Sequence, residues 1–170
     1  AYSEPEHFKA VVLLASNAWH SPWGIAFNES QRWAIENDPT WRDTHPKAGQ
    51  QGLELARSIA LLSYRSYQSY SHSQSDEFSF AGRRKPATYQ RYQGQKLRKR
   101  FNAFSYYRLS QAMDSHDIGR GRRGAATALQ QIPVPALIIH LQGDVLFPQQ
   151  EQQFIAENMP HADFTCIETE

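Results

Sequence analysis

Cysteine and long apolar runs are scarce in this sequence. The 170 residues contain one cysteine, Cys166, which excludes an internal disulfide framework. Because Cys166 falls in a predicted strand, we expect a small buried side chain rather than a nucleophile. No apolar run approaches the roughly 20 residues that a membrane-spanning helix needs, and the first residues, AYSEPEHFK, lack the features of a signal peptide. We therefore expect no membrane association and no secretion.

Net charge is small as well, at +1, but it is unevenly distributed. Residues 83–123 contain twelve Lys or Arg and only two acids, with tyrosines among them. This pattern is typical of a nucleic-acid-binding surface. It is equally typical of solvated helix faces, or of an inlet that attracts anionic substrates. The residues alone leave both interpretations open.

The stretch ALIIHLQGDVLFP, residues 136–148, predicts a strand, a short loop and the start of a helix. Its apolar run, interrupted by His140, is typical of a strand buried on both faces near 136–143. Pro148 suits a first helical position ahead of a helix over 149–158. Asp144 then lies at the carboxyl end of the strand, where open α/β sheets carry their chemistry. The alternative is that Asp144 only caps the helix or shapes the turn.

Two further strands are predicted near residues 8–15, FKAVVLLA, and 163–168. The order strand, helix, strand at the C-terminal end indicates a parallel sheet. The segment between the first two strands is too long for a simple crossover, so we expect it to contain an inserted helical subdomain. The fold class is therefore α/β, with about three parallel strands and a helical insertion.

Helices are expected in the insertion over residues 25–37, 53–67 and 89–113, with a long loop over 69–86. The last helix is expected in two pieces, because Gly94 weakens the first piece and Asn102 or Ser105 can cap the second. Arg57 and Tyr64 are seven residues apart on the second predicted helix. Because seven residues are close to two helical turns, the two side chains would share one face. Without other information this pair fits a half-exposed arginine with a tyrosine packed over the next turn.

A metal site is not expected. His116 stands between two carboxylates, Asp114 and Asp117, but no second ligand pair at metal-binding spacing accompanies it. The glycine- and arginine-rich run at 119–124 has no preceding strand, so it does not fit a nucleotide-binding loop.

Four strings together resemble homoserine O-acetyltransferases, which are α/β-hydrolase-fold enzymes of methionine biosynthesis. The match runs in order over nearly the whole chain. The strings are SPWGIAFNESQRWAI (21–35), GLELARSIALLSYRS (52–66), RYQGQKLRKRFNAFSYYRLSQAMDSHDIGR (91–120) and GDVLFP (143–148). The resemblance implies the C-terminal part of a hydrolase core over 1–22 and 132–170, and a helical lid over 23–131.

The resemblance also implies a chemistry and roles for three residues. Members of this family transfer an acetyl group from acetyl-CoA to L-homoserine through a Ser-Asp-His triad. Asp144 in GDVLFP matches the triad acid, and Arg57 and Tyr64 match lid residues that help to hold the amino-acid substrate. We expect acetyl-CoA as co-substrate, no cofactor and no metal. Whether the donor is acetyl-CoA or succinyl-CoA, and the acceptor homoserine or serine, stays open.

The triad serine and histidine are not found among these residues. No G-x-S-x-G-like elbow occurs, and neither His140, inside a strand, nor His161, before one, is placed to act as the base. Asn102 stands where an acid is expected in many relatives. We therefore expect a fragment that is inactive alone and that associates with the remainder of the same enzyme or with a second copy, because the strand at 8–15 would leave an open sheet edge. The resemblance further implies a homodimer through the lid and a cytoplasmic location.

Two other hypotheses remain. One is a non-catalytic binding module whose basic, tyrosine-rich stretch 83–123 contacts nucleic acid, although the resemblance already explains that stretch as lid. The other is a naturally truncated relative with a regulatory or structural role. The favoured interpretation is the enzyme fragment, with neither nucleic acid nor membrane as a partner.

Overall fold

The computed structural model describes residues 1–75 and 84–168. The chain divides into two compact units, one formed by Ala1–Ser21 with Ser115–Glu170 and the other by Pro22–Asp114. We call them the sheet unit and the helical unit. In the described ranges, no helix combines the length and the apolar character that crossing a membrane requires.

The sheet unit is built on three parallel strands, as expected. The central strand pairs with both others, in the register Leu14↔Ile139 on one side and Ile138↔Phe164 on the other. Its elements in chain order are η1 (Pro5–His7), β1 (Val11–Leu14), α6 (Ala125–Gln130), β2 (Ala136–Leu141), α7 (Gln149–Asn158) and β3 (Ala162–Ile167). The predicted strands and the helix at 149–158 are thus present, with shorter strands than expected.

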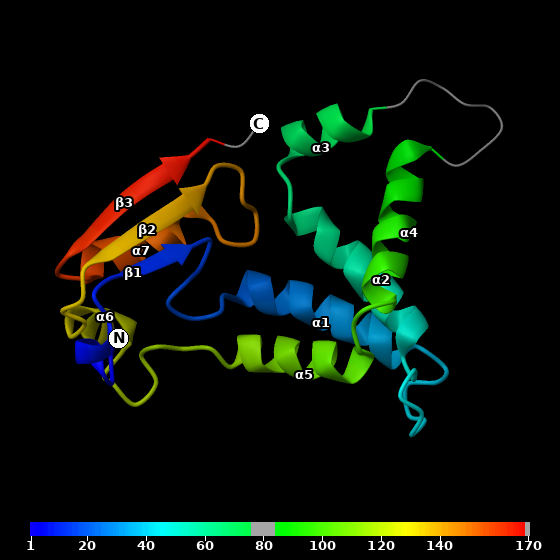
Figure 1. The fold of residues 1–170 in the computed structure, drawn as a ribbon, viewed down its shortest axis with the longest axis horizontal. Coiled ribbons are helices and arrows are strands. Elements are labelled where there is room, and N and C mark those ends of the chain that lie inside the picture. Colours follow the sequence, from blue (N-terminus) through cyan, green and yellow to red (C-terminus); the bar gives the residue numbers. More distant parts are fainter. Residues whose placement is uncertain (76–83, 169–170) are drawn as a thin grey trace. The chain divides into compact units, whose positions relative to one another are not determined.

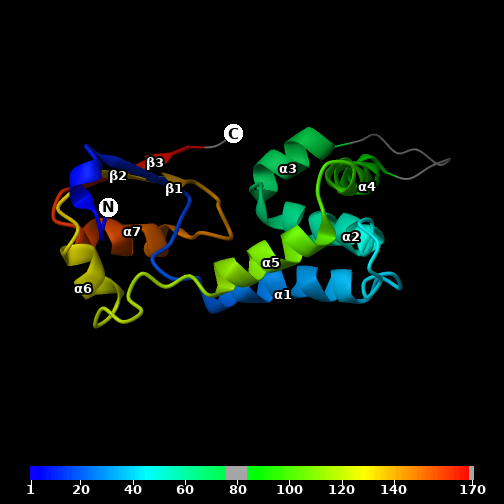
Figure 2. The same ribbon diagram turned by 60° about the horizontal axis from the view of Figure 1, so that its bottom comes forward.

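Among the described residues of the sheet unit, helices cover one face of the sheet. Helices α6 and α7 lie on the same side of it (Figure 2), and Ile138 packs there against Leu129 and Ile155. On the other face Val12 and Leu14 are 63% and 53% exposed. Leu137 of β2 is 37% exposed as well. The expectation of a strand buried on both faces near 136–143 is therefore wrong, because strand side chains alternate in direction and no described helix packs on the second face.

Cys166 is exposed, so the expectation of a buried cysteine is wrong. It lies near the end of β3, which is an edge strand. Ala162 and Phe164, earlier on the same strand, pack against the core, whereas Cys166 lies beyond that cover. Sequence pattern identified the strand but not its place at the edge.

The helical unit contains six helical elements among the described residues. They are α1 (Pro22–Glu36), α2 (Gln50–Ala60), η2 (Leu61–Ser63), α3 (Tyr67–Gln74), α4 (Lys85–Arg98) and α5 (Ala103–Asp114). The predicted interruption near residue 100 is confirmed: the Ser105 amide donates to Asn102 Oδ1 at 3.1 Å at the start of α5. The loop predicted over 69–86 is wrong where α3 forms, because Ser66 accepts from the Ser69 amide and caps that helix. Residues 76–83 of that predicted loop lie outside the described part.

The core of the helical unit is formed where α1, α2, α4 and α5 meet. Figure 1 shows α1 and α5 side by side and α4 running along α2. The buried apolar residues are Ile35, Leu53, Ala56, Leu97 and Ala103. Gly94 permits the contact of α4 with α2, since a Cβ there would lie 2.5 Å from the Glu54 carbonyl oxygen. Gly94 therefore lies inside α4 because the packing requires it.

A buried arginine joins α1 to the end of α5. The Arg32 guanidinium lies 2.6 Å from both Glu29 Oε2 and Asp114 Oδ2, and it donates to Ser110 Oγ at 3.2 Å. Burial acts to lower the pKa of Arg32, but the hydrogen bonds and charges of the two carboxylates outweigh it and raise that pKa. The side chain is therefore a charged structural link within this unit.

The helical unit ends at Asp114, earlier than the lid segment of 23–131 expected from sequence. Helix α6 packs with the sheet instead, through Ala125 and Leu129. Residues 115–131 therefore belong structurally to the sheet unit.

Candidate active site

Asp144 lies in a tight loop directly after β2. Gly143 adopts φ 79°, a left-handed conformation that favours glycine, and the chain turns there. The Asp144 amide donates to the Leu141 carbonyl at 3.1 Å. Asp144 Oδ1 then accepts from the Leu146 amide at 2.8 Å and the Phe147 amide at 2.9 Å. The carboxylate is half-buried and fixed by its own loop.

This geometry fits both interpretations of Asp144. Two backbone amides on Oδ1 make it a turn-forming residue. No described residue hydrogen-bonds Oδ2, so that oxygen can accept an N–H from an imidazole. One side chain can therefore shape the loop and orient a histidine.

The two histidines weighed from the sequence lie elsewhere. His140 is buried within β2, where its Nδ1 lies 3.0 Å from Gln152 Nε2. His161 is exposed just before β3. Within the described ranges, neither hydrogen-bonds Asp144.

Pro148 is the residue that precedes α7, one position earlier than expected.

Arg57 and Tyr64 are brought together, although not by the continuous helix predicted from sequence. Helix α2 ends at Ala60 and continues as the short 3-10 turn η2, so the helix expected over 53–67 is wrong beyond residue 60. The Arg57 guanidinium carbon nevertheless lies 4.6 Å from the centre of the Tyr64 ring. This distance is typical of a cation–π contact.

The Arg57 guanidinium keeps its hydrogen-bonding capacity. None of the described residues forms a hydrogen bond or an ion pair with it, and the side chain is half-buried. A planar group with five N–H donors, seated on an aromatic ring, is well suited to bind a carboxylate in a bidentate manner. Tyr64 is 55% exposed, so the pair is accessible in the helical unit as described.

A third side chain, Tyr106, belongs to this neighbourhood and was not singled out from the sequence. Its hydroxyl donates to the Oε1 atom of the buried Gln31. Burial, with a smaller effect from Tyr64, raises the pKa of Tyr106 to about 12, while Arg57 acts in the opposite direction. In sequence Tyr106 was one of several tyrosines in a basic stretch, and only the packing distinguishes it.

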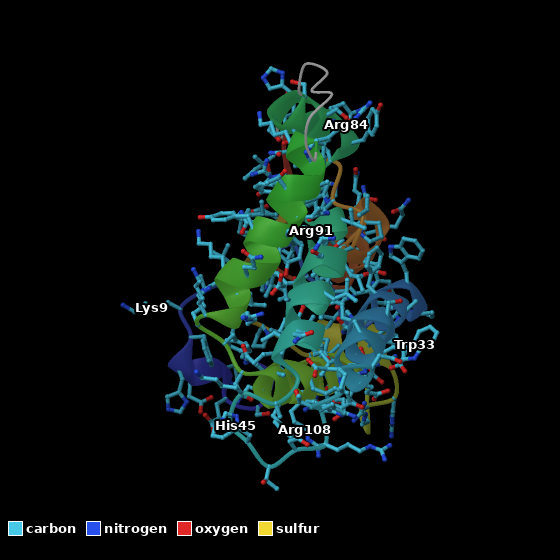
Figure 3. All side chains as sticks on the ribbon, turned by 90° about the vertical axis from the view of Figure 1, so that its right-hand side faces the viewer. Lys9, Trp33, His45, Arg84, Arg91 and Arg108 are labelled. Carbon is cyan, nitrogen blue, oxygen red and sulfur yellow. The ribbon has the colours of Figure 1, made fainter. Side chains whose placement is uncertain are left out.

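The basic stretch is distributed over separate elements. Figure 3 labels Arg84 and Arg91 along α4, and Arg108, which lies on α5. This arrangement fits solvated helix faces better than one continuous nucleic-acid surface. Figure 3 also shows Trp33, a largely exposed residue of α1.

Among the described residues, no three or more His, Cys, Asp or Glu side chains gather in a way that could hold a metal ion. The geometry described above is instead that of an acid at a strand exit and, in the other unit, an arginine on an aromatic ring.

Comparison with solved structures defines the class of fold. A homoserine O-acetyltransferase from Bacillus anthracis superposes with a TM-score of 0.87 over 99% of this chain and 49% of its own, at 16% identity. An alpha/beta hydrolase enzyme from a deep-sea metagenome library superposes with a TM-score of 0.70 over 98% of this chain and 50% of its own, at 20% identity. The chain therefore has part of an α/β-hydrolase fold with an α-helical segment between its first two strands.

Sequence comparison then identifies the particular relatives. A homoserine O-acetyltransferase from Cyclobacterium marinum is 47% identical over 167 residues, which are 98% of this chain and 48% of that protein. No family model matches the chain. The chain is a homologue of homoserine O-acetyltransferases, as its resemblance to them implied. It spans about half the length of the curated relatives it matches.

Proposed function

We propose that the chain is the part of a homoserine O-acetyltransferase that carries the triad acid and the helical lid, and that it acts in methionine biosynthesis. The observation that carries the proposal is the 47% identity to such an enzyme over 98% of the chain. The position of Asp144 at the exit of the central strand supports it independently. Its chemistry is therefore acyl transfer rather than nucleic-acid binding.

Asp144 is the acid in this proposal. Its Oδ1 is held by the Leu146 and Phe147 amides, and Oδ2 accepts the Nδ1–H of the catalytic histidine. An acid in that place keeps the imidazole in the correct tautomer and stabilises the imidazolium that forms during each transfer. The serine and the histidine are contributed by the remainder of the enzyme.

The reaction has two balanced halves. The serine oxygen attacks the thioester carbon of acetyl-CoA, its proton passes to the histidine, and CoA leaves as the thiol after taking that proton. The hydroxyl of homoserine then attacks the acetyl-serine, its proton passes to the histidine and on to the serine oxygen, and O-acetylhomoserine leaves. Asp144 stabilises the charged histidine in both halves. The mechanism is ping-pong because CoA leaves before homoserine reacts with the acetyl-serine.

Arg57 and Tyr64 bind the acceptor in this proposal. The guanidinium receives the α-carboxylate of homoserine through two parallel hydrogen bonds, and the Tyr64 ring keeps the guanidinium in place. The working enzyme is further proposed to be a cytoplasmic homodimer that associates through its lid helices. Acetyl-CoA is a co-substrate, and no cofactor is required.

CoA release measured with a thiol reagent tests the function. The isolated 170-residue chain is expected to release none. The longer gene product that contains it is expected to release CoA continuously only when both acetyl-CoA and homoserine are present, because acetyl-CoA alone can release no more than a single CoA from each active site before the acetyl-serine accumulates. Succinyl-CoA and serine, supplied in turn, identify the preferred donor and acceptor. Release by the isolated chain would overturn the assignment of Asp144 as one member of an incomplete triad.

Variants of the gene product test the two sites. Asp144→Asn is expected to lower kcat by roughly a thousandfold or more, as for other triad acids, whereas the exposed Asp163→Asn changes it little. Arg57→Lys is expected to raise KM for homoserine by about tenfold, because a lysine cannot form the bidentate pair. Arg65→Lys is the matched control, since Arg65 also lies over a tyrosine ring, at 5.7 Å. Equal effects of the two arginine variants would refute the substrate role of Arg57.

A further inference from the structure

Gln152 of α7 is a polar residue in an apolar core. Its exposed fraction is 0%, and it is one of the largest fully buried side chains, as Ile138 and Ile155 of the same unit are. Burying an amide costs free energy unless its hydrogen bonds are replaced. A fully buried glutamine at this place therefore requires a reason.

Both hydrogens of the Gln152 amide are used. Nε2 donates to the Phe147 carbonyl oxygen at 2.8 Å, and it lies 3.0 Å from His140 Nδ1. The carbonyl can only accept, so the nitrogen and not the oxygen of the amide faces it. Since that nitrogen can only donate, His140 Nδ1 accepts and the imidazole proton is on Nε2. The contact fixes the amide orientation and the histidine tautomer together.

Phe147 connects this buried pair to Asp144. Its carbonyl accepts from Gln152, and its amide donates to Asp144 Oδ1 at 2.9 Å. The Phe147 backbone is thus held from both sides, by the core helix and by the carboxylate. A shift of its carbonyl would move an amide that positions Asp144.

The remaining polar atom of Gln152 carries a cost. Its Oε1 is buried and has no hydrogen-bond partner among the described residues. A methionine or leucine would fill similar space without that unsatisfied oxygen. The amide is therefore better explained by what its nitrogen does for the loop than by packing.

We propose that Gln152 is a positioning residue, which holds the loop after β2 through the Phe147 carbonyl so that Asp144 presents its free oxygen to the catalytic histidine. This rests on the proposed function of Asp144 as the triad acid. Gln152 acts on the reaction only through Phe147 and Asp144. His140 completes the arrangement as the acceptor that fixes the amide.

Three variants of the gene product that contains the chain test the proposal. Gln152→Met removes the donor at nearly constant volume. The double variant Gln152→Met/His140→Leu also removes the imidazole nitrogen, which would otherwise be left buried without a donor. This avoids the free-energy cost of that unpaired acceptor, while the Phe147 carbonyl still lacks its hydrogen bond from residue 152. Gln150→Met makes the same change at an exposed position of α7 and is the control.

Hydrogen exchange gives the deciding measurement. We expect amide exchange of residues 144–147 to rise about tenfold in both Gln152 variants and not in the control, while residues 162–167 of the double variant stay within about twofold of the parent. In the same proteins kcat should fall about tenfold or more with KM for homoserine unchanged.

Unchanged amide exchange at residues 144–147 overturns the proposal, and so does an unchanged kcat when these amides exchange faster. If the parent itself catalyses no transfer, the proposed function has failed, and the exchange measurement alone decides whether Gln152 holds the loop. The two failures are therefore distinguishable.

Discussion

Asp38 fixes the start of α2, and its replacement by asparagine is a sharp test of how the helical unit is held together. The side chain is 7% exposed. Its Oδ2 accepts from the Gln51 amide at 2.8 Å and the Gly52 amide at 2.9 Å. Its Oδ1 accepts from the Thr40 amide at 2.9 Å and the Thr40 hydroxyl at 2.7 Å. One buried carboxylate thus satisfies three backbone donors and a side chain.

Asp38→Asn keeps the size of the side chain but replaces one acceptor oxygen with an NH2 group. In one orientation that NH2 group would face the two amide donors at the start of α2, and in the other it would face the two donors of Thr40. Because an NH2 group cannot accept, at least one pair of hydrogen bonds is lost in either orientation. Hydrogen bonds to a charged group and loss of a helix cap together give a decrease of roughly 2–4 kcal/mol in the free energy of unfolding.

The loss should depend on pH with a definite sign. Burial acts to raise the pKa of Asp38, but hydrogen bonds from Gly52, Thr40 and Gln51 outweigh it, and the pKa lies below its usual range. A carboxyl group whose pKa is lowered by folding stabilises the protein above its unfolded pKa of about 4. That stability is lost as the pH falls through the folded pKa. The difference in the free energy of unfolding between the parent and Asp38→Asn should therefore be largest at pH 7 and should decrease below about pH 4.

Urea denaturation followed by tryptophan fluorescence measures this, since Trp41 lies in the same loop. Asp43→Asn is the matched control, because Asp43 is an exposed carboxylate of that loop and only its amide is bonded, to the Thr40 carbonyl. A destabilisation below about 0.5 kcal/mol, the range of ordinary surface changes, would refute the reasoning. The reasoning would also be refuted if the parent and Asp38→Asn differed in the free energy of unfolding by the same amount at pH 7 and in acid.

Two further substitutions test the packing of the helical unit. Gly94→Ala should lower the free energy of unfolding by about 1–3 kcal/mol, because the new Cβ would clash with the Glu54 carbonyl. This overpacking outweighs the better helix propensity of alanine. Thermal unfolding measures the change in stability. Arg32→Met should cost about 3 kcal/mol in urea denaturation, because it leaves Asp114 without its closest cation.

Neighbouring substitutions provide the controls for both. Gln95→Ala, at an exposed position of α4, should be neutral or slightly stabilising. Arg108→Met, at an exposed position of α5, should change stability by less than about 0.5 kcal/mol. A stabilising Gly94→Ala would contradict the close approach of the two helices, and equal effects of the two arginine variants would contradict the buried ion pair.

Much of the fold could be predicted because local signals were strong. The apolar run before Gly143 located the central strand, and Pro148 with the following residues located α7. Asn102 marked the start of α5, since its side chain can cap a helix. The interruption between α4 and α5 was therefore predictable from sequence.

Predictions that depended on distant neighbours were less reliable. Cys166 was expected to be buried, but nothing in a strand pattern tells an edge from a centre. Arg57 and Tyr64 do contact each other, yet the helix assumed to align them ends at Ala60. Gln152 gave no signal at all, because a glutamine in a helix is ordinarily exposed.

The sequence by itself determined the order of the elements and the place of Asp144 at the exit of the central strand, because periodicity and turn residues act over a few neighbouring positions. Its similarity to homoserine O-acetyltransferases also followed from the residues alone. Only the tertiary structure decided that no described residue hydrogen-bonds Asp144 Oδ2, and that the buried Gln152 of α7 donates to the Phe147 carbonyl and lies 3.0 Å from His140 Nδ1 of β2. The contact of Gln152 with His140 joins a helix to a strand, so it exists only once α7 has packed against the sheet.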